Sequence, residues 1–567
     1  MQKRSWRLII LIAIFLLMAA SLMGRLFYLQ IISHKYYSAL ALGQQTGFNE
    51  IKGSRGEVFL QNSQDSKGAQ SSGEIKSLAI NKEVWTLGAS VQNIKDKEAF
   101  AEAVGAITNT LPAVILEKIS NTENYVVLKK EVTPTEVVGL RALAVGGIDL
   151  QSSLARYYPQ ESLASQLIGF VGGGDGTGQY GLEGFYEDEL KGKMGIQEEK
   201  RGFDIISIVS GGQSLNGTDL YLTIDYNIQF QAESLLQEAA QKLSMASGQI
   251  LVIKPDSGRI LALANYPSFN PNEYGRQTDY GIFQNSAVQK IFEPGSIFKP
   301  FTMAVALNEG KITPDATFID TGSVKIGPAV IYNFDRKVYG VSDMSRVLEK
   351  SINTGAVWIS QQIPHDTFVN YLGEFGFNQK TGVDVQGEVY SRNDILKTGS
   401  ATGFATASFG QGIEMTPVQL AAAFSMFANG GKVVTPYVVE KMVSGGQEQK
   451  AQPNISGQVI SAKTAEQVTK MMINVVERGF GDIARIPGYY LAGKTGTAQV
   501  SYEDKKGYYP DKTIQSFIGF GPALKPEFLI LVKLDDPKVP TSSLSAAPIF
   551  GKLAQFIINY WQIPPDY

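Results

Sequence analysis

The sequence contains one Ser-x-x-Lys, in which Ser296 and Lys299 open a segment with helical spacing of apolar residues, PFTMAVALNEG. At a helix start, two side chains with this spacing lie on one face of the first turn and can meet within hydrogen-bond reach. A serine hydroxyl becomes a good nucleophile when a base takes its proton, and a desolvated lysine can be neutral enough to do so. Because a serine at a helix start is more often a simple N-cap, this pair alone does not establish catalysis.

A serine–lysine acyl-transfer site also needs a Ser-x-Asn and a Lys-Thr-Gly, and both occur more than once. Among the Ser-x-Asn copies that begin at Ser268, Ser351 and Ser391, context favours Ser351. This copy lies between the helix-like SDMSRVLEK and the apolar AVWIS, whereas the other two lie in a proline-containing turn and a charged loop. Ser351 and Asn353 are therefore expected on a rigid, partly buried element.

Lys-Thr-Gly occurs at Lys380, Lys397 and Lys494. The first two copies have the composition of turns. Only the third lies in a strand-like run, YYLAGKTGTAQV, where Gly493 and Gly496 allow a substrate backbone to approach an edge strand closely. The sequence therefore predicts that Lys494 belongs to the site.

The N-terminal segment predicts a membrane anchor in residues 1–40. Lys3, Arg4 and Arg7 precede an uncharged apolar run, LIILIAIFLLMAASLMG, close to the shortest length that crosses a bilayer. The positive-inside rule places the N-terminus in the cytoplasm and the rest of the chain outside the cytoplasmic membrane. A cleaved signal peptide is the alternative, because Ala19-Ala20-Ser21 has the small residues of a cleavage site.

The remaining chain predicts an α+β, multidomain protein. Residues 41–215 mix short apolar alternations with turn chemistry, which indicates a small α+β pedestal domain with an exposed loop at 61–74. Residues 216–567 read as one large domain. Its strand pair GQILVIKPDSGRILALANY, the late strands QSFIGFG and FLILVKL, and the flanking helical patterns predict an antiparallel sheet covered by helices.

Composition excludes several classes of function. The formal charge is -3 over 567 residues, so nothing in the global charge suggests nucleic acid as a partner. The chain has no cysteine, which rules out thiolate catalysis, disulfides and cysteine-bound metals. The chain has only two histidines, His34 and His365, so it offers few candidates for a Ser-His-Asp triad or a histidine metal cluster. His365 is interpreted as a surface residue.

In their order along the chain, EPGSIFKP, SINTGA and AGKTGTAQ resemble the three active-site motifs of penicillin-binding protein transpeptidase domains. Further segments of the same domain are YPSFNPN, SFGQGIEMTPVQLAAAFSMFANGG and SFIGFGP, while RLFYLQI, RG, RYYP and GLEGFYEDELKGKMG resemble the class B pedestal. Two segments depart from that pattern: EVFLQNSQDSKG replaces the usual Asp-Arg-Asn-Gly turn, and SSLSAAPIF lacks a glycine pair. The resemblance covers nearly the whole chain.

The resemblance implies a role for each motif residue. Ser296 is expected to be the acylated nucleophile and Lys299 its general base. Ser351 is expected to relay a proton to the leaving D-alanine, Asn353 to hold the acyl-donor peptide and Lys299, and Lys494 to tune Ser351 electrostatically.

The strand residues that follow Lys494 are expected to bind substrate. Thr495 and Thr497 hold the terminal carboxylate, Gly496 lets the peptide approach, and the backbone N–H groups of Ser296 and Thr497 form the oxyanion hole. The resemblance implies that neither a metal nor an organic cofactor is required.

The implied activity is a serine D,D-transpeptidase that cross-links peptidoglycan stem peptides and is acylated by β-lactams. A D,D-carboxypeptidase or a β-lactamase shares the motifs, but the anchor, the pedestal and the long spacing between Ser351 and Lys494 favour a polymer-building enzyme. A non-catalytic scaffold or β-lactam sensor is disfavoured because all three motifs are intact. The resemblance also implies a SEDS-family glycan polymerase as partner, with other divisome or elongasome membrane proteins, and fits the septal type better than the elongation type.

Overall fold

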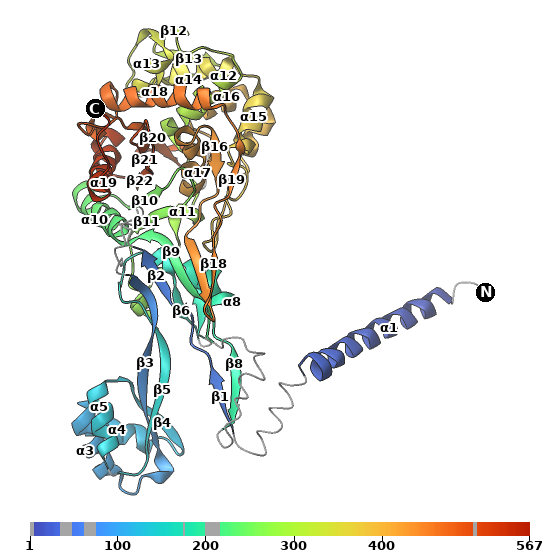
Figure 1. Ribbon diagram of the computed structural model, residues 1–567, viewed down its shortest axis with the longest axis vertical. Coiled ribbons are helices and arrows are strands. Elements are labelled where there is room, and N and C mark those ends of the chain that lie inside the picture. Colours follow the sequence, from blue (N-terminus) through green and yellow to red (C-terminus); the bar gives the residue numbers. More distant parts are fainter. Residues whose placement is uncertain are drawn as a thin grey trace.

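The computed structural model describes residues 5–33, 48–61, 75–143, 145–173, 176–198, 216–502 and 507–567. Lys3, Arg4, His34, most of the predicted loop at 61–74 and the predicted boundary at 215 lie outside these residues. Apart from its first helix, the chain forms an elongated body with a small lobe at one end and a large, helix-rich lobe at the other (Figure 1).

The first helix has the properties expected of a membrane anchor. Helix α1 (Ser5–Phe27) continues into a π-helical turn, η1 (Tyr28–Ile32). The apolar stretch Ile10–Ile31 has a mean hydropathy of 2.3, and its most apolar window is 0% buried. By length and composition this helix can cross a membrane.

The small lobe is built on the long strand β3 (Lys76–Ser90). It pairs antiparallel with β4 (Tyr125–Val132) on one side and β5 (Ile148–Tyr157) on the other. Helices α3 (Lys97–Thr108), α4 (Pro112–Ser120) and α5 (Pro134–Ala142) cover this sheet around a separate apolar core. Asp96 caps α3, and a capping box formed by Thr133 and Glu136 starts α5, so local sequence fixes both helix starts.

Three of the pedestal motifs meet at one buried carboxylate. The Glu183 side chain is 0% exposed and accepts Arg55 Nε at 2.7 Å and Arg156 Nε at 2.6 Å. Tyr158 Oη also donates to Glu183 Oε1 at 3.3 Å. A buried carboxylate is tolerable only when it is paired in this way, so the RG, RYYP and GLEG segments hold one another in place.

The sheet of the small lobe continues into the large lobe as one seven-stranded sheet. Its strand order is β18 (Gln447–Lys450), β17 (Val439–Ser444), β9 (Asp219–Asp225), β2 (Val58–Gln61), β3 and β4. Strand β2 runs parallel to β9 and antiparallel to β3. Strands from both sides of the predicted boundary at 215 therefore belong to one sheet.

The large lobe contains the predicted antiparallel sheet. Its order is β11 (Ile260–Tyr266), β10 (Ser247–Ile253), β22 (Phe528–Asp535), β21 (Tyr508–Gly521) and β20 (Ala492–Ser501), with every neighbouring pair antiparallel. The predicted β10–β11 hairpin is confirmed. Strand β20 lies at the edge of this sheet.

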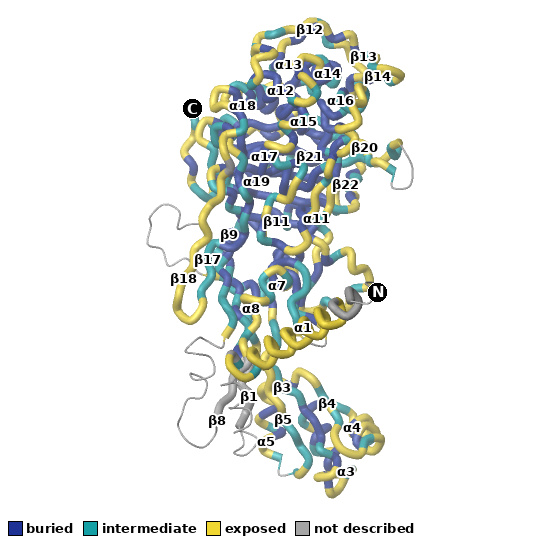
Figure 2. The backbone as a smooth tube through the Cα atoms, turned by 90° about the vertical axis from the view of Figure 1, so that its right-hand side faces the viewer, coloured by how far each residue is buried: buried dark blue, intermediate teal, exposed yellow. Residues whose placement is uncertain are grey.

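Side-chain alternation explains why helices cover both faces of this sheet. Ile250 and Val252 on β10 belong to a core shared with α10 (Tyr226–Leu243) and α19 (Ala546–Tyr560). Leu251 and Ile253 belong to the other core, which contains α12 (Lys299–Asn308) and α17 (Pro417–Ala428). Successive residues point to opposite faces of a strand, so a continuous apolar run is buried on both sides. Figure 2 shows the resulting buried centre of the large lobe.

The remaining elements are short or lie around these sheets. In the first half of the chain they are β1 (Phe48–Lys52), which pairs with β8 (Met194–Glu198), η3 (Val91–Asn93), α6 (Ser165–Ile168), β6 (Phe170–Gly172), β7 (Thr177–Gln179), α7 (Gly181–Phe185) and α8 (Glu187–Leu190). Between β11 and α17 they are η4 (Pro271–Arg276), η5 (Tyr280–Phe283), α11 (Ser286–Gln289), η6 (Gly295–Phe298), β12 (Thr317–Asp320), β13 (Ser323–Ile326), β14 (Ala329–Tyr332), β15 (Gly340–Asp343), α13 (Met344–Glu349), α14 (Asn353–Gln361), α15 (His365–Glu374), η7 (Asp394–Thr398) and α16 (Ala401–Ala407). After α17 they are β16 (Lys432–Val434), β19 (Ile455–Gln458), α18 (Ala462–Arg478), η8 (Asp482–Ala484) and η9 (Ser542–Leu544).

Candidate active site

Ser296 lies in a short 3-10 turn, η6, that leads directly into α12. Its side chain is half-buried, and Pro300 is accommodated because it occupies the first turn of α12. Gly295 has φ +58°, and a Cβ at this position would lie 3.1 Å from the Cβ of Ala498 on β20. The absence of a side chain at Gly295 therefore lets the serine turn pack directly against the edge strand.

Lys299 starts α12 with its side chain only 1% exposed. Its amine donates to Ser351 Oγ at 3.1 Å, to Asn353 Oδ1 at 2.8 Å and to the Ser351 carbonyl. In the part of the chain that the structure describes, no hydrogen bond joins this amine to Ser296 Oγ, so the predicted Ser296–Lys299 contact is replaced by contacts to the second motif. Burial, and next the charge of Lys494, hold the pKa of Lys299 well below its ordinary value.

The second motif sits in a tight connection between α13 and α14. Ser351 has φ +52°, and Ile352 is fully buried, which fixes the half-buried residues on either side of it. The Asn353 amide is held at both ends, because its Nδ2 donates to the Tyr332 carbonyl at 2.9 Å while its Oδ1 accepts from Lys299. A strained backbone held by this many contacts is typical of functional sites.

The third motif brings a second buried amine to the same hydroxyl. Lys494, on β20, is 0% exposed and donates to Ser351 Oγ at 3.0 Å, to the Thr495 carbonyl at 3.0 Å and to Thr495 Oγ1 at 3.3 Å. Burial lowers the pKa of Lys494 to about 7. One serine hydroxyl therefore lies between two amines that titrate far more easily than an ordinary lysine, an arrangement that suits proton transfer.

The residues after Lys494 form the wall along which a peptide could bind. Thr495 is 6% exposed, and Thr497 is half-buried with its hydroxyl accepting the Ser542 N–H at 3.3 Å. A Cβ on Gly496 would lie 2.5 Å from Ser516 Oγ and 3.0 Å from Ile297 Cγ2, so the strand and the serine turn approach too closely for a side chain. An edge strand of this kind can pair with an extended peptide.

The other copies of the motifs have separate, local partners. Lys397 lies in η7 with its side chain 52% exposed and pairs with Asp394 at 2.7 Å. In the Lys380 copy, Thr381 N and Gly382 N donate to the Glu388 carboxylate, which makes a turn. Neither of these two Lys-Thr-Gly copies lies in a strand, which agrees with the prediction from the sequence.

The two other Ser-x-Asn copies also have structural partners. Ser391 donates weakly to Glu414 at 3.5 Å, and Asn393 Oδ1 accepts the Glu414 N–H at 2.8 Å. Asn270 caps the short helix η4 after Ser268. The structure thus gathers Ser296, Lys299, Ser351, Asn353 and Lys494 with the Thr495–Thr497 strand, and gives the alternative copies other contacts.

Sequence reasoning missed several residues that support this cluster. Asn333 Oδ1 accepts the Asn353 N–H at 3.1 Å, and Ser542 contacts Thr497. Close to Ser296 in the sequence, Glu293 accepts hydrogen bonds from Tyr508 Oη at both carboxylate oxygens, each at 3.2 Å. Ser542 lies in SSLSAAPIF and Glu293 in EPGSIFKP, so the sequence had drawn attention to both segments without indicating these contacts.

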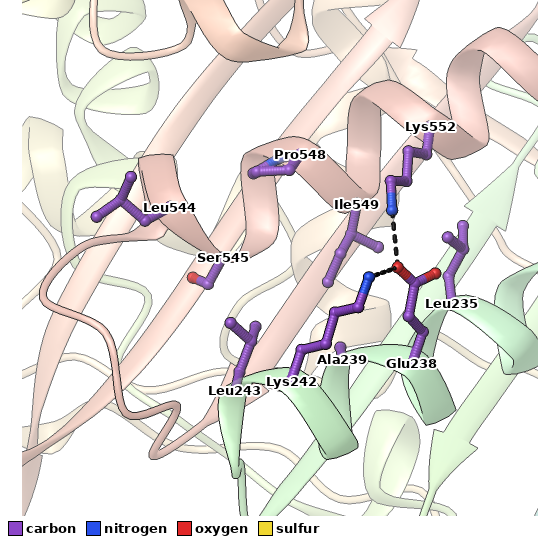
Figure 3. A pocket seen from close by; sticks show the side chains of 10 residues that line it. All are labelled: Leu235, Glu238, Ala239, Lys242, Leu243, Leu544, Ser545, Pro548, Ile549 and Lys552. Carbon is purple, nitrogen blue, oxygen red and sulfur yellow. Dashed lines mark hydrogen bonds and ion pairs between the residues drawn. The ribbon is translucent and has the colours of Figure 1, made fainter.

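A surface cavity of about 130 Å³ lies elsewhere, between α10 and α19 (Figure 3). Its rim carries Glu238, which pairs with Lys242 at 2.6 Å and Lys552 at 2.9 Å. None of the predicted site residues lines this cavity. The cavity is therefore separate from the cluster around Lys494.

Comparison with known proteins agrees with this geometry. Residues 248–555 match the penicillin binding protein transpeptidase domain, and residues 52–222 match the penicillin-binding protein dimerisation domain. This chain belongs to the penicillin-binding proteins. The presence of both domains in one chain matches the class B type predicted from the sequence.

Several penicillin-binding proteins resemble this one over almost its whole length. The probable peptidoglycan D,D-transpeptidase PbpC of Pseudomonas aeruginosa is 30% identical over 100% of this chain and 97% of its own. Stage V sporulation protein D of Bacillus subtilis is 29% identical over 93% of this chain and 82% of its own. Among solved structures, penicillin-binding protein 3 of Mycobacterium tuberculosis complexed with aztreonam superimposes with a TM-score of 0.70 at 25% identity, over 92% of this chain and 98% of that one.

Proposed function

We propose that this penicillin-binding protein is a peptidoglycan D,D-transpeptidase in which Ser296 is the acylated nucleophile. The observation that carries the assignment is the Ser351 hydroxyl, which lies 3.1 Å from the Lys299 amine and 3.0 Å from the Lys494 amine. Such an arrangement can take a proton from one group and deliver it to another without exposing a charge to solvent.

In the acylation step, neutral Lys299 takes the proton of Ser296 as Ser296 Oγ bonds to the penultimate D-alanine carbonyl. The C–N bond to the terminal D-alanine then breaks, and the proton passes through Ser351 to that leaving amine. The backbone N–H groups of Ser296 and Thr497 stabilise the oxyanion, each worth about 3–4 kcal/mol. Thr495 and Thr497 bind the terminal carboxylate, while Asn353 orients both Lys299 and the acyl-donor peptide.

In the second step, the amine of another stem peptide attacks the acyl-enzyme, and an amide cross-link replaces the ester to Ser296. A β-lactam acylates the same serine but leaves an ester that resists this attack, which makes it a covalent inhibitor. Hydrolysis by water, as in a D,D-carboxypeptidase or β-lactamase, differs only in the acceptor. The full-length similarity to peptidoglycan D,D-transpeptidases supports an amine acceptor.

The chain is proposed to be oriented with its N-terminus in the cytoplasm. Arg7, with Lys3 and Arg4, precedes the apolar stretch Ile10–Ile31, and basic residues stay on the cytoplasmic side. In this arrangement residues 1–40 form the stub and anchor, residues 41–215 the pedestal, and residues 216–567 the extracytoplasmic transpeptidase domain. A SEDS-family polymerase supplies the glycan strands through contacts with the anchor and pedestal, in cell division or cell-wall elongation, with the sequence closer to the septal type.

The direct test of the nucleophile is labelling by a fluorescent penicillin. Ser296→Ala should abolish the covalent label while the protein stays folded, since the half-buried Ser296 side chain caps neither η6 nor α12. Intact-protein mass spectrometry on the labelled wild type should place the adduct on the peptide that contains Ser296. Persisting label on the alanine variant would falsify the assignment.

A further inference from the structure

The geometry of β20 fixes the direction in which an acyl-donor peptide must run, given the proposed roles of Ser296, Thr495 and Thr497. The terminal carboxylate lies at the two threonines. The scissile carbonyl lies at Ser296, whose turn packs beside Ala498, further along the strand. The residues that precede the scissile bond must therefore continue along β20 toward its last residue, Ser501.

A carboxylate and a phenol stand at this end of the strand. Tyr508 is the direct partner of Ser501 in the β20–β21 pairing. Its hydroxyl donates to both carboxylate oxygens of Glu293 at 3.2 Å. Glu293 itself precedes Ser296 by three positions and lies just before the η6 turn that holds Ser296.

The backbone holds Glu293 in this position. The preceding residue, Phe292, exchanges two hydrogen bonds with Met415, with N–O distances of 2.9 and 3.1 Å. The Gly412 backbone N–H is near enough to the Glu293 carboxylate to lower its pKa. The backbone before Glu293 and the hydrogen bond from Tyr508 therefore restrain this side chain, which suits it to anchor a ligand group.

The electrostatic surroundings of Glu293 favour a cation. Its hydrogen-bond donor, Tyr508, and the nearby Gly412 N–H are both neutral, and no lysine or arginine within the described ranges forms an ion pair with it. Partial burial is the main cause that raises its pKa to about 7, and the nearby charge of Glu414 raises it further. An ammonium group arriving here would remove both penalties.

The chemistry of the reaction supplies such a group. Transpeptidation joins the carbonyl of one stem peptide to an amine of another, and the two stems are copies of the same repeating unit. The acyl-donor stem therefore carries the same kind of amine on a residue before its D-alanines. We propose that Glu293, positioned by Tyr508, binds the side-chain ammonium of the acyl-donor stem and so selects stems with a free amine at that residue.

The test compares two soluble pentapeptides that end in D-alanyl-D-alanine. They are identical except that the side-chain amine of a lysine before the D-alanines is free in one and acetylated in the other. The wild-type protein should release D-alanine from the free-amine peptide with a kcat/KM about tenfold higher, the usual size of one charge-assisted hydrogen bond. Glu293→Gln should bring this ratio to within about twofold of one, and Tyr508→Phe should lower it by a smaller factor.

Glu273→Gln is the matched control, because Glu273 is an exposed carboxylate that pairs with Arg276 and should keep the tenfold ratio. A Glu293→Gln protein that still prefers the free amine tenfold overturns the inference. Should that variant fail to fold, Tyr508→Phe decides instead, since an unchanged ratio there contradicts the positioning. Loss of penicillin labelling at Ser296 in the wild-type protein would be a different failure, that of the proposed function.

Discussion

The same three residues, Lys-Thr-Gly, occur in β20 and at the end of η7 with opposite properties. In β20 the Lys494 amine is fully buried and donates to Ser351 Oγ, and burial lowers its pKa to about 7. In η7 the Lys397 side chain is 52% exposed and pairs with Asp394, three positions away. The tripeptide alone does not determine whether its lysine can take part in a reaction. Its position on a buried edge strand makes the lysine useful, because only a desolvated amine changes its protonation near neutral pH.

The largest effect should come from removing the base that shares Ser351 with Lys494. Lys299→Ala should slow penicillin acylation nearly as much as Ser296→Ala, by roughly a thousandfold or more, because members of one catalytic unit are strongly non-additive. The Ser296→Ala, Lys299→Ala double variant should be scarcely slower than either single variant. Stopped-flow labelling measures this, and two independent losses that multiply would show that Lys299 is not the base.

A smaller effect should appear in the pH dependence of acylation. Lys299 must be neutral to accept a proton, so the rate should rise with pH until its lowered pKa is passed. Lys494 must be protonated to tune Ser351 electrostatically, so the rate should fall by about tenfold per pH unit above its pKa of about 7. The falling limb should be missing in Lys494→Ala and unchanged in Lys397→Ala. A falling limb that persists without Lys494 would assign it to another group.

The sequence predicted the parts of this site that depend on local pattern. The helix after Ser296, the antiparallel sheet covered by helices and the edge-strand position of Lys494 follow from apolar spacing and glycine placement, and the structure has them. The sequence around each copy also indicated which Ser-x-Asn and Lys-Thr-Gly to choose, and the rejected copies have nearby partners of their own.

Contacts between distant segments could not be predicted in the same way. The direction of the Lys299 amine depends on the left-handed backbone at Ser351, which no local pattern indicates. Asn333 reaches Asn353 from the far side of a small two-stranded sheet, and Tyr508 reaches Glu293 across more than two hundred residues. The sheet that joins β2 to β9 and β17 also pairs strands far apart in sequence. Such contacts follow from packing of whole elements and leave no periodicity in the sequence.

The most direct test of the account is a paired measurement of penicillin acylation in Lys494→Ala and Lys397→Ala. The two variants remove the same side chain from the same tripeptide, so they differ only in its surroundings. Lys494→Ala should lower the second-order acylation rate constant by about a hundredfold or more, the usual cost of a lost electrostatic or acid–base group, and Lys397→Ala should leave it within about twofold of wild type. The reverse result would be a large loss of acylation rate in Lys397→Ala and a rate near wild type in Lys494→Ala. It would contradict the assignment of β20 to the active site and with it the roles of Thr495, Gly496 and Thr497.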